Sequence, residues 1–488
     1  MKTSVLSWLL ACLSFTAGQA QTPPIAPPHP LPAAGLLVIS HVNIVDVVRE
    51  YVLEDRTVVV RDGCIESVGK QAPTGRAVQR LNGRGLYLVP GLWDSRVCVL
   101  DAAADVQALP LYVAYGITSI RDQSTGRPRA ELLAIVRALE SGQQSSPRIE
   151  LAGGVVDGPN GAGRHRAATR AEGRAQAEAL LQEGWRGLTT TVQLPREAYL
   201  GVAEAARTWH VPLVGPIPEA VLALEAASAG HRWIEGTDKL LLGCSTREEE
   251  LAAARAHSLA GSQPLGDLPA RIAGQQKAIA ASFSLARCQV LGQALARQQT
   301  VVIPMLLTGA AQQHRDLTPN DARLRYVPAA VRQQWAAAEA RRPAEAAHAI
   351  DSLRRRMVAE FQRLGVPLMA GSGAGGPVPY VFHGASLLDE LDCLVAAGLS
   401  PGQALQAATV VPAIAAGHRF DLGQIAPDYH ADLLLLEGNP LEDIRNLRRV
   451  RAVVLRGRVL NQSALAALAA DAARSAQLAR PEPAASTH

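Results

Sequence analysis

Three side chains that could do chemistry follow one apolar run near residue 90. Asp94, Arg96 and Cys98 are spaced two residues apart in WDSRVC at positions 93–98, directly after the stretch LVPGL. Side chains two apart on a β-strand point to the same face, so a carboxylate, a permanent cation and a thiol would meet there. Such a set suits ion pairing, binding of an anionic or carbonyl-bearing ligand, or thiol chemistry.

Histidines do not complete a metal site with these residues. The chain has 12 histidines, but the closest pairs are 12 residues apart, so no HxH, HxxH or HExxH motif occurs. His165 and His383 lie in loops that could face a common centre, although the ordinary interpretation is a surface or loop histidine. Cys98 could bind a soft metal, but one thiolate does not hold zinc without partners.

Composition excludes several classes of protein. Of the 488 residues, 48% are apolar and 19% charged, which is enough for a large core and carries no disorder signature. The 48 basic and 44 acidic residues leave a net charge of +4, too small a bias to predict nucleic-acid binding. The cysteines that follow residue 20 are scattered and allow at most two disulfides.

The N-terminal residues predict a targeting segment rather than part of a folded domain. Residues 1–20 have one Lys, an apolar run and small residues near Ala20, which predicts a signal peptide and export to the periplasm or outside the cell. A lipoprotein anchor at Cys12 is the weaker alternative, because it leaves a very short leader. Residues 21–35 are a Pro-rich linker. No other apolar run reaches 18 residues, so no membrane span is expected.

The elements that would position the reactive side chains fall into two groups. Short strands are expected in residues 36–87 and again in 420–462, and two β blocks at opposite ends of a chain can build one small sandwich. Between them, residues 88–419 alternate eight strand candidates with helices, which favours a (β/α)8 barrel over an open doubly wound sheet. Residues 308–365 read as a helical insertion, and residues 463–488 as an Ala-rich helix and tail.

Motifs along most of the chain follow the order of one family. They are PGLWDSRVC at 90–98, GITSIRD at 116–122, GASLLDEL at 384–391, AGLSP at 397–401, and ADLL and GNPL within 431–441. In this order they resemble the amidohydrolase superfamily, most closely its imidazolonepropionase-like branch. The resemblance spans roughly residues 36–460. It implies a (β/α)8 barrel with a sandwich built from both ends, and a hydrolase of carbon–nitrogen bonds other than peptide bonds.

The same resemblance implies a metal, normally zinc or another divalent ion, at the C-terminal mouth of the barrel. Its ligands would be two His on strand one, sometimes a carboxylated Lys on strand four, a His on each of strands five and six, and an Asp on strand eight that takes a proton from the metal-bound water. The residues at these positions are Arg96, Cys98, Thr189, Pro216, Gly236 and Gly373. Each family ligand is replaced, so no metal cofactor is expected.

Few polar groups remain in the predicted mouth. Asp94, Arg96, Cys98 and Glu235 are weak catalytic candidates, and Asp122 and Ser372 lie at strand ends nearby. Arg96 could form a structural ion pair with Asp94 or Glu235. It could instead bind an anionic or carbonyl-bearing ligand. Cys98 could act as a nucleophile, although no histidine base is adjacent in the sequence.

The function expected from these residues is binding. We predict an exported amidohydrolase-family protein without the family's metal ligands, a pseudoenzyme whose barrel binds a small molecule or a protein partner. The alternative is a divergent hydrolase that acts on carbon–nitrogen bonds of cyclic amides or peptide-like substrates. The family resembled often forms dimers, so a homo-oligomer or a hetero-oligomer with related chains is compatible with both hypotheses.

Overall fold

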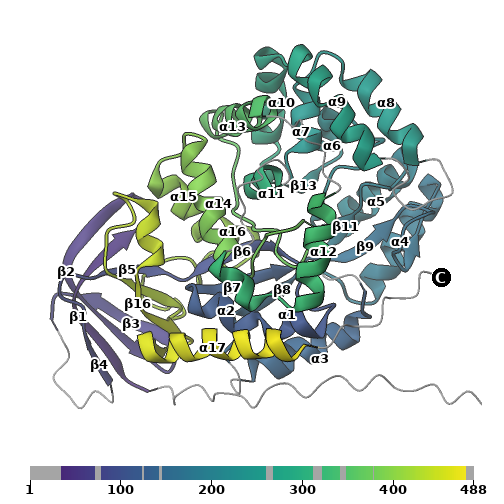
Figure 1. The fold of residues 1–488 in the computed structure, drawn as a ribbon. Coiled ribbons are helices and arrows are strands. Elements are labelled where there is room, and N and C mark those ends of the chain that lie inside the picture. Colours follow the sequence, from purple (N-terminus) through teal and green to yellow (C-terminus); the bar gives the residue numbers. More distant parts are fainter. Residues whose placement is uncertain are drawn as a thin grey trace, which may run out of the picture.

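The computed structural model describes residues 35–71, 79–123, 126–141, 145–259, 268–311, 321–340, 348–376 and 378–479. It combines a ring of parallel strands with a separate mixed sheet at one end of the molecule (Figure 1). The predicted signal peptide, nearly all of the Pro-rich linker, Cys12 and the last nine residues lie outside the described residues. None of the described helices is long and apolar enough to cross a bilayer.

Strands from the two ends of the chain share the mixed sheet. Its order is β17-β16-β15-β5-β1-β2-β3, with β4 also pairing with β1. Antiparallel pairing of β5 with β15 joins the two halves, and Leu433 lies opposite Pro90. The strands are β1 (Leu37–Asp46), β2 (Tyr51–Arg61), β3 (Cys64–Gly69), β4 (Gln79–Asn82), β5 (Tyr87–Pro90), β15 (Leu433–Leu436), β16 (Val450–Leu455) and β17 (Arg458–Asn461).

The sheet wraps around an apolar core of its own. The turn between β2 and β3 uses positive φ at Asp62 and Gly63, as a tight hairpin requires. Beyond it, the backbone N–H of Ile65 donates to the carbonyl oxygen of Tyr429 at 2.8 Å, so β3 meets the C-terminal segment again. Buried aliphatic side chains of both halves form one cluster. This is the β-rich unit that the sequence predicted.

The barrel has eight strand positions, of which the labelled strands fill the first seven. The strands are β6 (Leu92–Val97), β7 (Ile117–Asp122), β8 (Arg148–Leu151), β9 (Gly154–Asp157), β11 (Leu188–Thr190), β12 (Leu213–Gly215), β13 (His231–Glu235) and β14 (Val301–Ile303), with the short β10 (His165–Arg166) beside β9. β6 to β8 pair in order, and β9 pairs with β11, which is followed by β12, β13 and β14. β8 and β9 are two halves of strand three, interrupted at residues 152–153.

Backbone hydrogen bonds on both sides close the ring at residues 367–373, which take the eighth position. On one side the N–H of Met369 donates to the carbonyl oxygen of Val302 at 2.9 Å. On the other side the N–H of Ser95 donates to the carbonyl oxygen of Ala370, also at 2.9 Å. The predicted fold class, a barrel with a β-rich unit from both chain ends, is confirmed.

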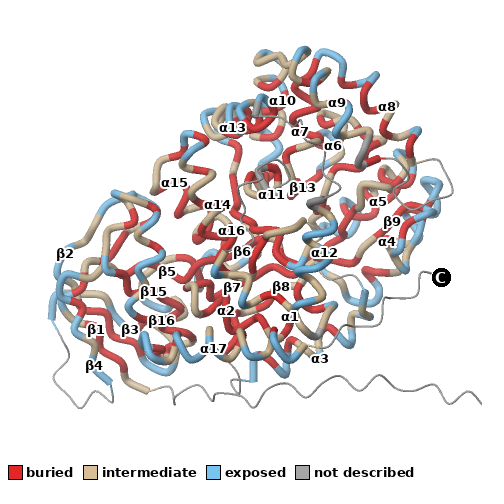
Figure 2. Tube along the Cα trace, in the orientation of Figure 1, coloured by how far each residue is buried: buried red, intermediate tan, exposed pale blue. Residues whose placement is uncertain are grey.

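Helices surround the barrel and bury its outer face. Figure 2 shows buried positions concentrated in the strands and in the inner sides of these helices. The helices are α1 (Ala103–Gln107), α2 (Leu109–Ala114), α3 (Arg129–Glu140), α4 (Arg170–Gln182), α5 (Arg196–Thr208), α6 (Ala223–Ser228), α7 (Asp238–Gly243), α8 (Glu248–Leu259), α9 (Leu268–Ser282), α10 (Leu285–Arg297), α11 (Leu306–Ala311), η1 (Ala322–Tyr326), α12 (Ala329–Ala340), α13 (His348–Arg363), α14 (Ala385–Ala396), α15 (Pro401–Ala407), α16 (Val410–Ala415), η2 (Ile444–Arg448) and α17 (Gln462–Leu478).

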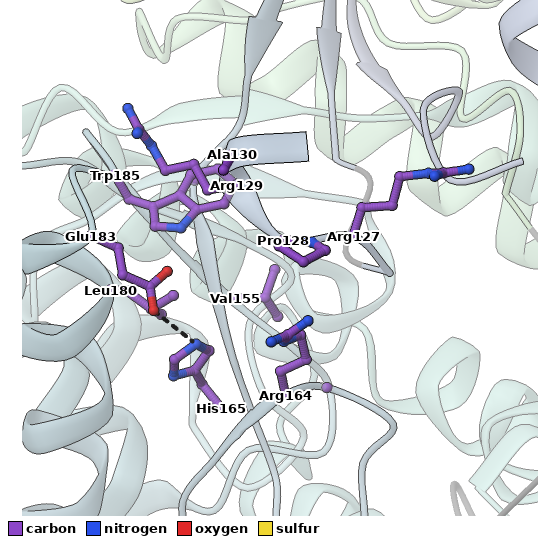
Figure 3. Close-up of a pocket in the computed structure, with 12 residues that line it drawn as sticks. Arg127, Pro128, Arg129, Ala130, Val155, Arg164, His165, Leu180, Glu183 and Trp185 are labelled. Atoms are coloured by element: carbon purple, nitrogen blue, oxygen red, sulfur yellow. Dashed lines mark ion pairs between the residues drawn. The ribbon is translucent and has the colours of Figure 1, made fainter. Parts of the chain in front are cut away.

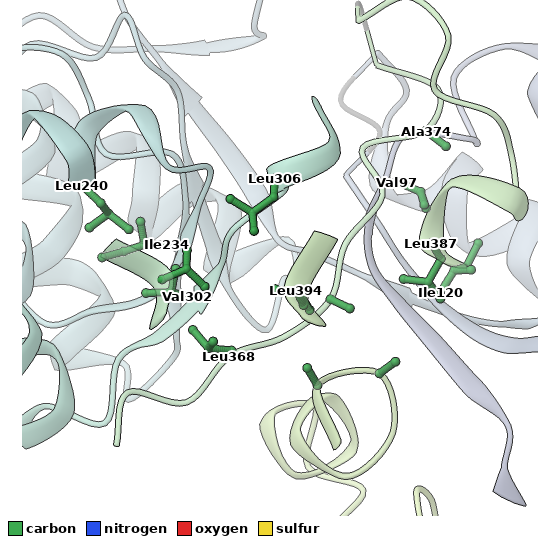
Figure 4. Close-up of a cluster of buried hydrophobic side chains, with 14 of the residues drawn as sticks. Val97, Ile120, Ile234, Leu240, Val302, Leu306, Leu368, Ala374, Leu387 and Leu394 are labelled. Atoms are coloured by element: carbon green, nitrogen blue, oxygen red, sulfur yellow. The ribbon is translucent and has the colours of Figure 1, made fainter. Parts of the chain in front are cut away.

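The core is mostly aliphatic, and aromatic residues make up only 4% of the chain. Figure 4 shows side chains from β13, β14 and the eighth position, among them Ile234, Val302 and Leu368, beside Leu306 of α11. A disulfide between Cys244 and Cys288 joins the end of α7 to α10. Cys64, Cys98 and Cys393 are free.

Candidate functional site

Strand β6 brings the first candidate residues to the C-terminal end of the barrel. Asp94 is fully buried, and its Oδ1 accepts hydrogen bonds from the backbone N–H groups of Ser372 (2.8 Å) and Arg96 (3.4 Å). Its Oδ2 has no hydrogen-bond partner among the described residues. Burial raises the pKa of this carboxyl to about 6, although both hydrogen bonds act in the opposite direction. Asp94 therefore joins strand one to the eighth strand position.

Arg96 reaches across the mouth to strand six. Its Nε lies 3.8 Å from Oε2 of Glu235, and its Nη1 donates to the carbonyl oxygen of Gly373 at 3.4 Å. The side chain of Arg96 is 19% exposed and that of Glu235 only 4%. A carboxylate so deeply buried needs a cation beside it. Of the two ion pairs that the sequence left open, the structure contains the one with Glu235.

A second guanidinium binds the same carboxylate. Nη1 of Arg121, at the end of β7, donates to Oε1 of Glu235 at 2.9 Å and to the carbonyl oxygen of Ser95 at 3.2 Å. Its guanidinium carbon lies 4.6 Å from the ring centroid of Trp233. The side-chain amide of Gln123 also donates to Glu235. Glu235 is therefore held by two cations from strands one and two, an arrangement we call the Arg96–Glu235–Arg121 centre.

In the sequence, Arg121 is noted only as part of the motif GITSIRD and is not placed at the site. Its position relative to Gln123 was the available signal, since residues two apart share one face. The Arg96–Glu235–Arg121 centre also contains nitrogen atoms that do not donate a hydrogen bond. Nε of Arg96, and Nε and Nη2 of Arg121, are buried and have no hydrogen-bond partner among the described residues.

The remaining positions at which the resemblance expects metal ligands lie at or near strand ends. Thr189 is on β11, with a buried Oγ1 that lacks a partner among the described residues, while Pro216 and Gly236 directly follow β12 and β13. Gly373 has φ +78°, and a Cβ atom there would come within 2.8 Å of Cγ2 of Thr308 and 3.8 Å of Nη1 of Arg96. The strained backbone and the crowding both oppose an acidic side chain at position 373.

These residues do not fit the divalent metal that the resemblance implies. Pro216, Gly236 and Gly373 offer no side-chain ligand, and the permanent charge of Arg96 repels a cation. In the part of the chain that the structure describes, no group of three or more His, Cys, Asp or Glu residues is placed to hold a metal ion.

Cys98 lies just beyond the end of β6 and is a poor nucleophile. Burial raises the pKa of its thiol to about 11, and the nearby Arg96 guanidinium only partly offsets that effect. Its backbone N–H donates to the carbonyl oxygen of Ala374 at 2.9 Å, which again ties strand one to the eighth position. The reactive form of a thiol is the thiolate, so this side chain is almost entirely unreactive at neutral pH.

A second buried polar network fastens the loops after β12 and β13, and nothing in the sequence pattern pointed to it. Nζ of Lys239 donates to the carbonyl oxygen of Glu219 at 3.1 Å. Nη1 of Arg255 lies 3.3 Å from Oε2 of Glu219, and its Nε donates to Gln275 at 2.7 Å. Burial lowers the pKa of Lys239 to about 8.

The two loop histidines bond to side chains outside the centre. His165 lies 2.9 Å from Oε1 of Gln176 and 3.8 Å from Glu183, and it lines a cleft of about 360 Å³ between α3 and α4. Figure 3 shows this cleft, with Arg129 beside the indole ring of Trp185. His383 bonds to Asp105 and Tyr112 in a different cleft.

Comparison with known proteins gives one family and one fold. Residues 334–460 match the model of the amidohydrolase family. No curated protein matches the chain. Among solved structures, the bottromycin amidohydrolase shares the fold with a TM-score of 0.65 at 20% identity, over 90% of each chain.

Two further structures share the fold. A Xaa-Pro dipeptidase with bound methionine has a TM-score of 0.60 at 16% identity, over 88% of this chain and 100% of the other. A putative prolidase from Bifidobacterium longum has a TM-score of 0.57 at 22% identity, over 90% and 100% of the two chains.

Proposed function

The chain belongs to the amidohydrolase superfamily, and from this premise we propose that its barrel binds a ligand at the Arg96–Glu235–Arg121 centre without the metal-dependent hydrolysis of that family. The observation that carries the proposal is the position of Arg96. The resemblance aligns Arg96 with the first ligand of strand one and Gly373 with the acid/base residue, and the Arg96 guanidinium donates to the carbonyl oxygen of Gly373 and pairs with Glu235. A fixed organic cation thus takes the place of a metal ion.

The spare donors of the centre favour ligand binding over a purely structural ion pair. A buried N–H group without an acceptor costs about 1–3 kcal/mol, and a charged group costs more. Nε and Nη2 of Arg121 are of this kind, whereas Nε of Arg96 faces Oε2 of Glu235 at 3.8 Å without a hydrogen bond. A ligand with a carboxylate or carbonyl oxygen would accept from them. Arg96 is the partly exposed member of the centre and is therefore the side through which such a ligand would enter.

One observation favours hydrolysis as a second candidate function. Asp94 has a pKa of about 6 and an unpartnered Oδ2, which are properties of a general base that works near neutral pH. Carbon–nitrogen bonds of cyclic amides or peptide-like compounds would be the substrate class, as in the amidohydrolase family. Cys98 does not strengthen this candidate, because its thiol is protonated.

Metal content and turnover decide between the two functions. Purified protein should contain well below one zinc, iron or manganese ion per chain, and a chelator should leave its melting temperature unchanged, because a tightly bound metal would stabilise the fold. A panel of amides, lactams and dipeptides should show no turnover with or without added zinc. About one metal ion per chain would refute the metal-free proposal. Metal-free turnover that is lost in Asp94→Asn would establish the hydrolase instead.

Export is part of the proposal. The disulfide between Cys244 and Cys288 supports it, because disulfides persist mainly in oxidising compartments. Fractionation of cells that express the full chain should recover it outside the cytoplasm, shortened by about 20 residues at the N-terminus. Recovery of the uncleaved chain in the cytoplasm would contradict export.

A further inference from the structure

A second cleft, which adjoins the Arg96–Glu235–Arg121 centre at Gly376, contains the elements of a specific binding site. It has a volume of about 430 Å³ and lies between α12, the segment 326–328, α1 and the loops at residues 375–376 and 379–383. Figure 1 shows α12 next to α1 on one side of the barrel. Volumes of 300–1,000 Å³ are typical of small-molecule sites.

One wall of the cleft carries a carboxylate whose orientation is fixed. Nε2–H of His383 donates to Oδ1 of Asp105 at 2.9 Å, which leaves Nδ1 to accept from the hydroxyl of Tyr112 at 3.0 Å. Tyr112 is fully buried, so the chain of hydrogen bonds is anchored in the core. Asp105 is held at the cleft surface with 28% of its side chain exposed. A fixed orientation lowers the entropy cost of binding a ligand there.

Asp105 has no cationic partner from Lys or Arg in the described part of the chain. No lining residue of the cleft is a Lys or Arg. Arg323 lies behind the lining, where it is bound by Asp321 and Asp389 and packs over Phe382, 4.4 Å from its ring centroid. A carboxylate in such a cleft repels anions and attracts cations.

Another part of the lining is aromatic. Trp335 of α12 stands edge-on to Phe382, with ring centroids 5.6 Å apart, and Tyr326 also lines the cleft. Trp335 and Tyr326 are partly exposed, whereas Phe382 is buried. Aromatic faces attract organic cations, and they also bury the apolar body of a ligand.

We propose that this cleft binds a small amphipathic amine, with its ammonium group on Asp105 and its apolar body against Trp335. Charge selects the ligand class, because the lining offers one oriented carboxylate and no Lys or Arg to receive an anion. The proposal does not depend on the function of the Arg96–Glu235–Arg121 centre.

Calorimetric titration of the full mature chain with three probes of similar shape tests the proposal. The probes are 2-phenylethylamine, the neutral 2-phenylethanol and the anion phenylacetate. We expect the amine to bind at least about tenfold more tightly than the alcohol, because an ammonium group makes a stronger hydrogen bond to a carboxylate than a neutral hydroxyl does. Phenylacetate should not bind in this cleft. Equal affinity for amine and alcohol in the wild-type protein would overturn the proposal without any variant.

Variants locate the site. Asp105→Asn should remove the preference for the amine and leave the affinity for the alcohol unchanged, whereas Trp335→Ala should weaken both probes. Glu249→Gln, an exposed carboxylate on α8, is the matched control and should change neither affinity. Unchanged amine binding in a folded Asp105→Asn variant would refute the assignment. If that variant fails to fold, full amine binding in Trp335→Ala would refute it instead.

Discussion

Nε of Arg96 lies 3.8 Å from Oε2 of Glu235, and this contact joins strand one to strand six across the mouth of the barrel. Glu235 also accepts from Arg121 on strand two, so one buried carboxylate connects three strands. In the amidohydrolase family a metal ion links side chains of several strands at this place. Here the Arg96–Glu235–Arg121 centre makes the links with charges that belong to the chain itself.

Truncation of Arg96 should therefore destabilise the fold. In Arg96→Met, Glu235 keeps Arg121 but loses its second cation, and we expect the free energy of unfolding to fall by about 2 kcal/mol, less than the 3–5 kcal/mol for a pair broken completely. Urea denaturation measures the change. Arg207→Ala, an exposed arginine on α5, is the control and should stay within about 0.5 kcal/mol of wild type. An Arg96→Met variant as stable as wild type would show that the ion pair between Arg96 and Glu235 does not stabilise the fold.

Glu390 should give the protein a pH-dependent stability. It is fully buried on α14 and accepts from the backbone N–H groups of Leu306 (2.9 Å) and Leu307 (2.7 Å), and burial raises its pKa to about 8. The folded state thus binds more protons than the unfolded state between about pH 4.3 and 8, so stability decreases as pH rises through this window. The Gln variant lacks this titration.

Urea denaturation of wild type and Glu390→Gln at pH 5, 6, 7 and 8 measures the effect. The stability of wild type relative to the variant should fall by up to about 1.4 kcal/mol per pH unit. Glu249→Gln should run parallel to wild type. Parallel curves for Glu390→Gln as well would mean that this carboxyl titrates normally.

The sequence could predict those parts of the fold that depend on neighbouring residues, and not those that depend on contacts between distant residues. Strand positions such as Ile117–Asp122 follow from apolar runs and from motifs with a fixed order. The apolar run from Leu86 toward Leu100 is instead divided between the sheet and the barrel. Gly91 is the residue between β5 of the mixed sheet and β6 of the barrel. It packs so closely against Thr118 that a Cβ atom at position 91 would lie 2.0 Å from Oγ1 of Thr118. No local sequence pattern reveals this contact.

The site was predictable position by position but not pair by pair. The side-chain types at Arg96 and Gly373 can be read from the sequence alone, since a side-chain type is local information. The pairing of Arg121 with Glu235 spans 114 residues, and that of His383 with Asp105 spans 278. Such pairs depend on which loops meet in three dimensions, which periodicity does not encode.

Cys98 should resist alkylation in the folded protein. With a pKa of about 11, it contains roughly two orders of magnitude less thiolate at pH 7.5 than an ordinary cysteine of pKa ≈ 8.5. Iodoacetamide labelling followed by peptide mass spectrometry should show slow modification of Cys98, which accelerates in urea. Arg96→Met should slow it further, because the guanidinium lowers the pKa of the thiol. Labelling as fast as in the unfolded chain would contradict the buried, protonated thiol.

Removal of the disulfide should cost more stability than removal of a free thiol. Cys244 and Cys288 are 44 residues apart in the sequence. A cross-link over a loop of this length lowers the conformational entropy of the unfolded chain and so stabilises the folded state by about 4 kcal/mol. The double variant Cys244→Ala/Cys288→Ala should therefore unfold at a clearly lower urea concentration than wild type. Cys393→Ser serves as the control for loss of a partly buried free thiol. If a reducing agent lowers the stability of wild type but not that of the double variant, the loss belongs to this bond. Equal stability of the oxidised wild type and the double variant would mean that the disulfide does not support the fold.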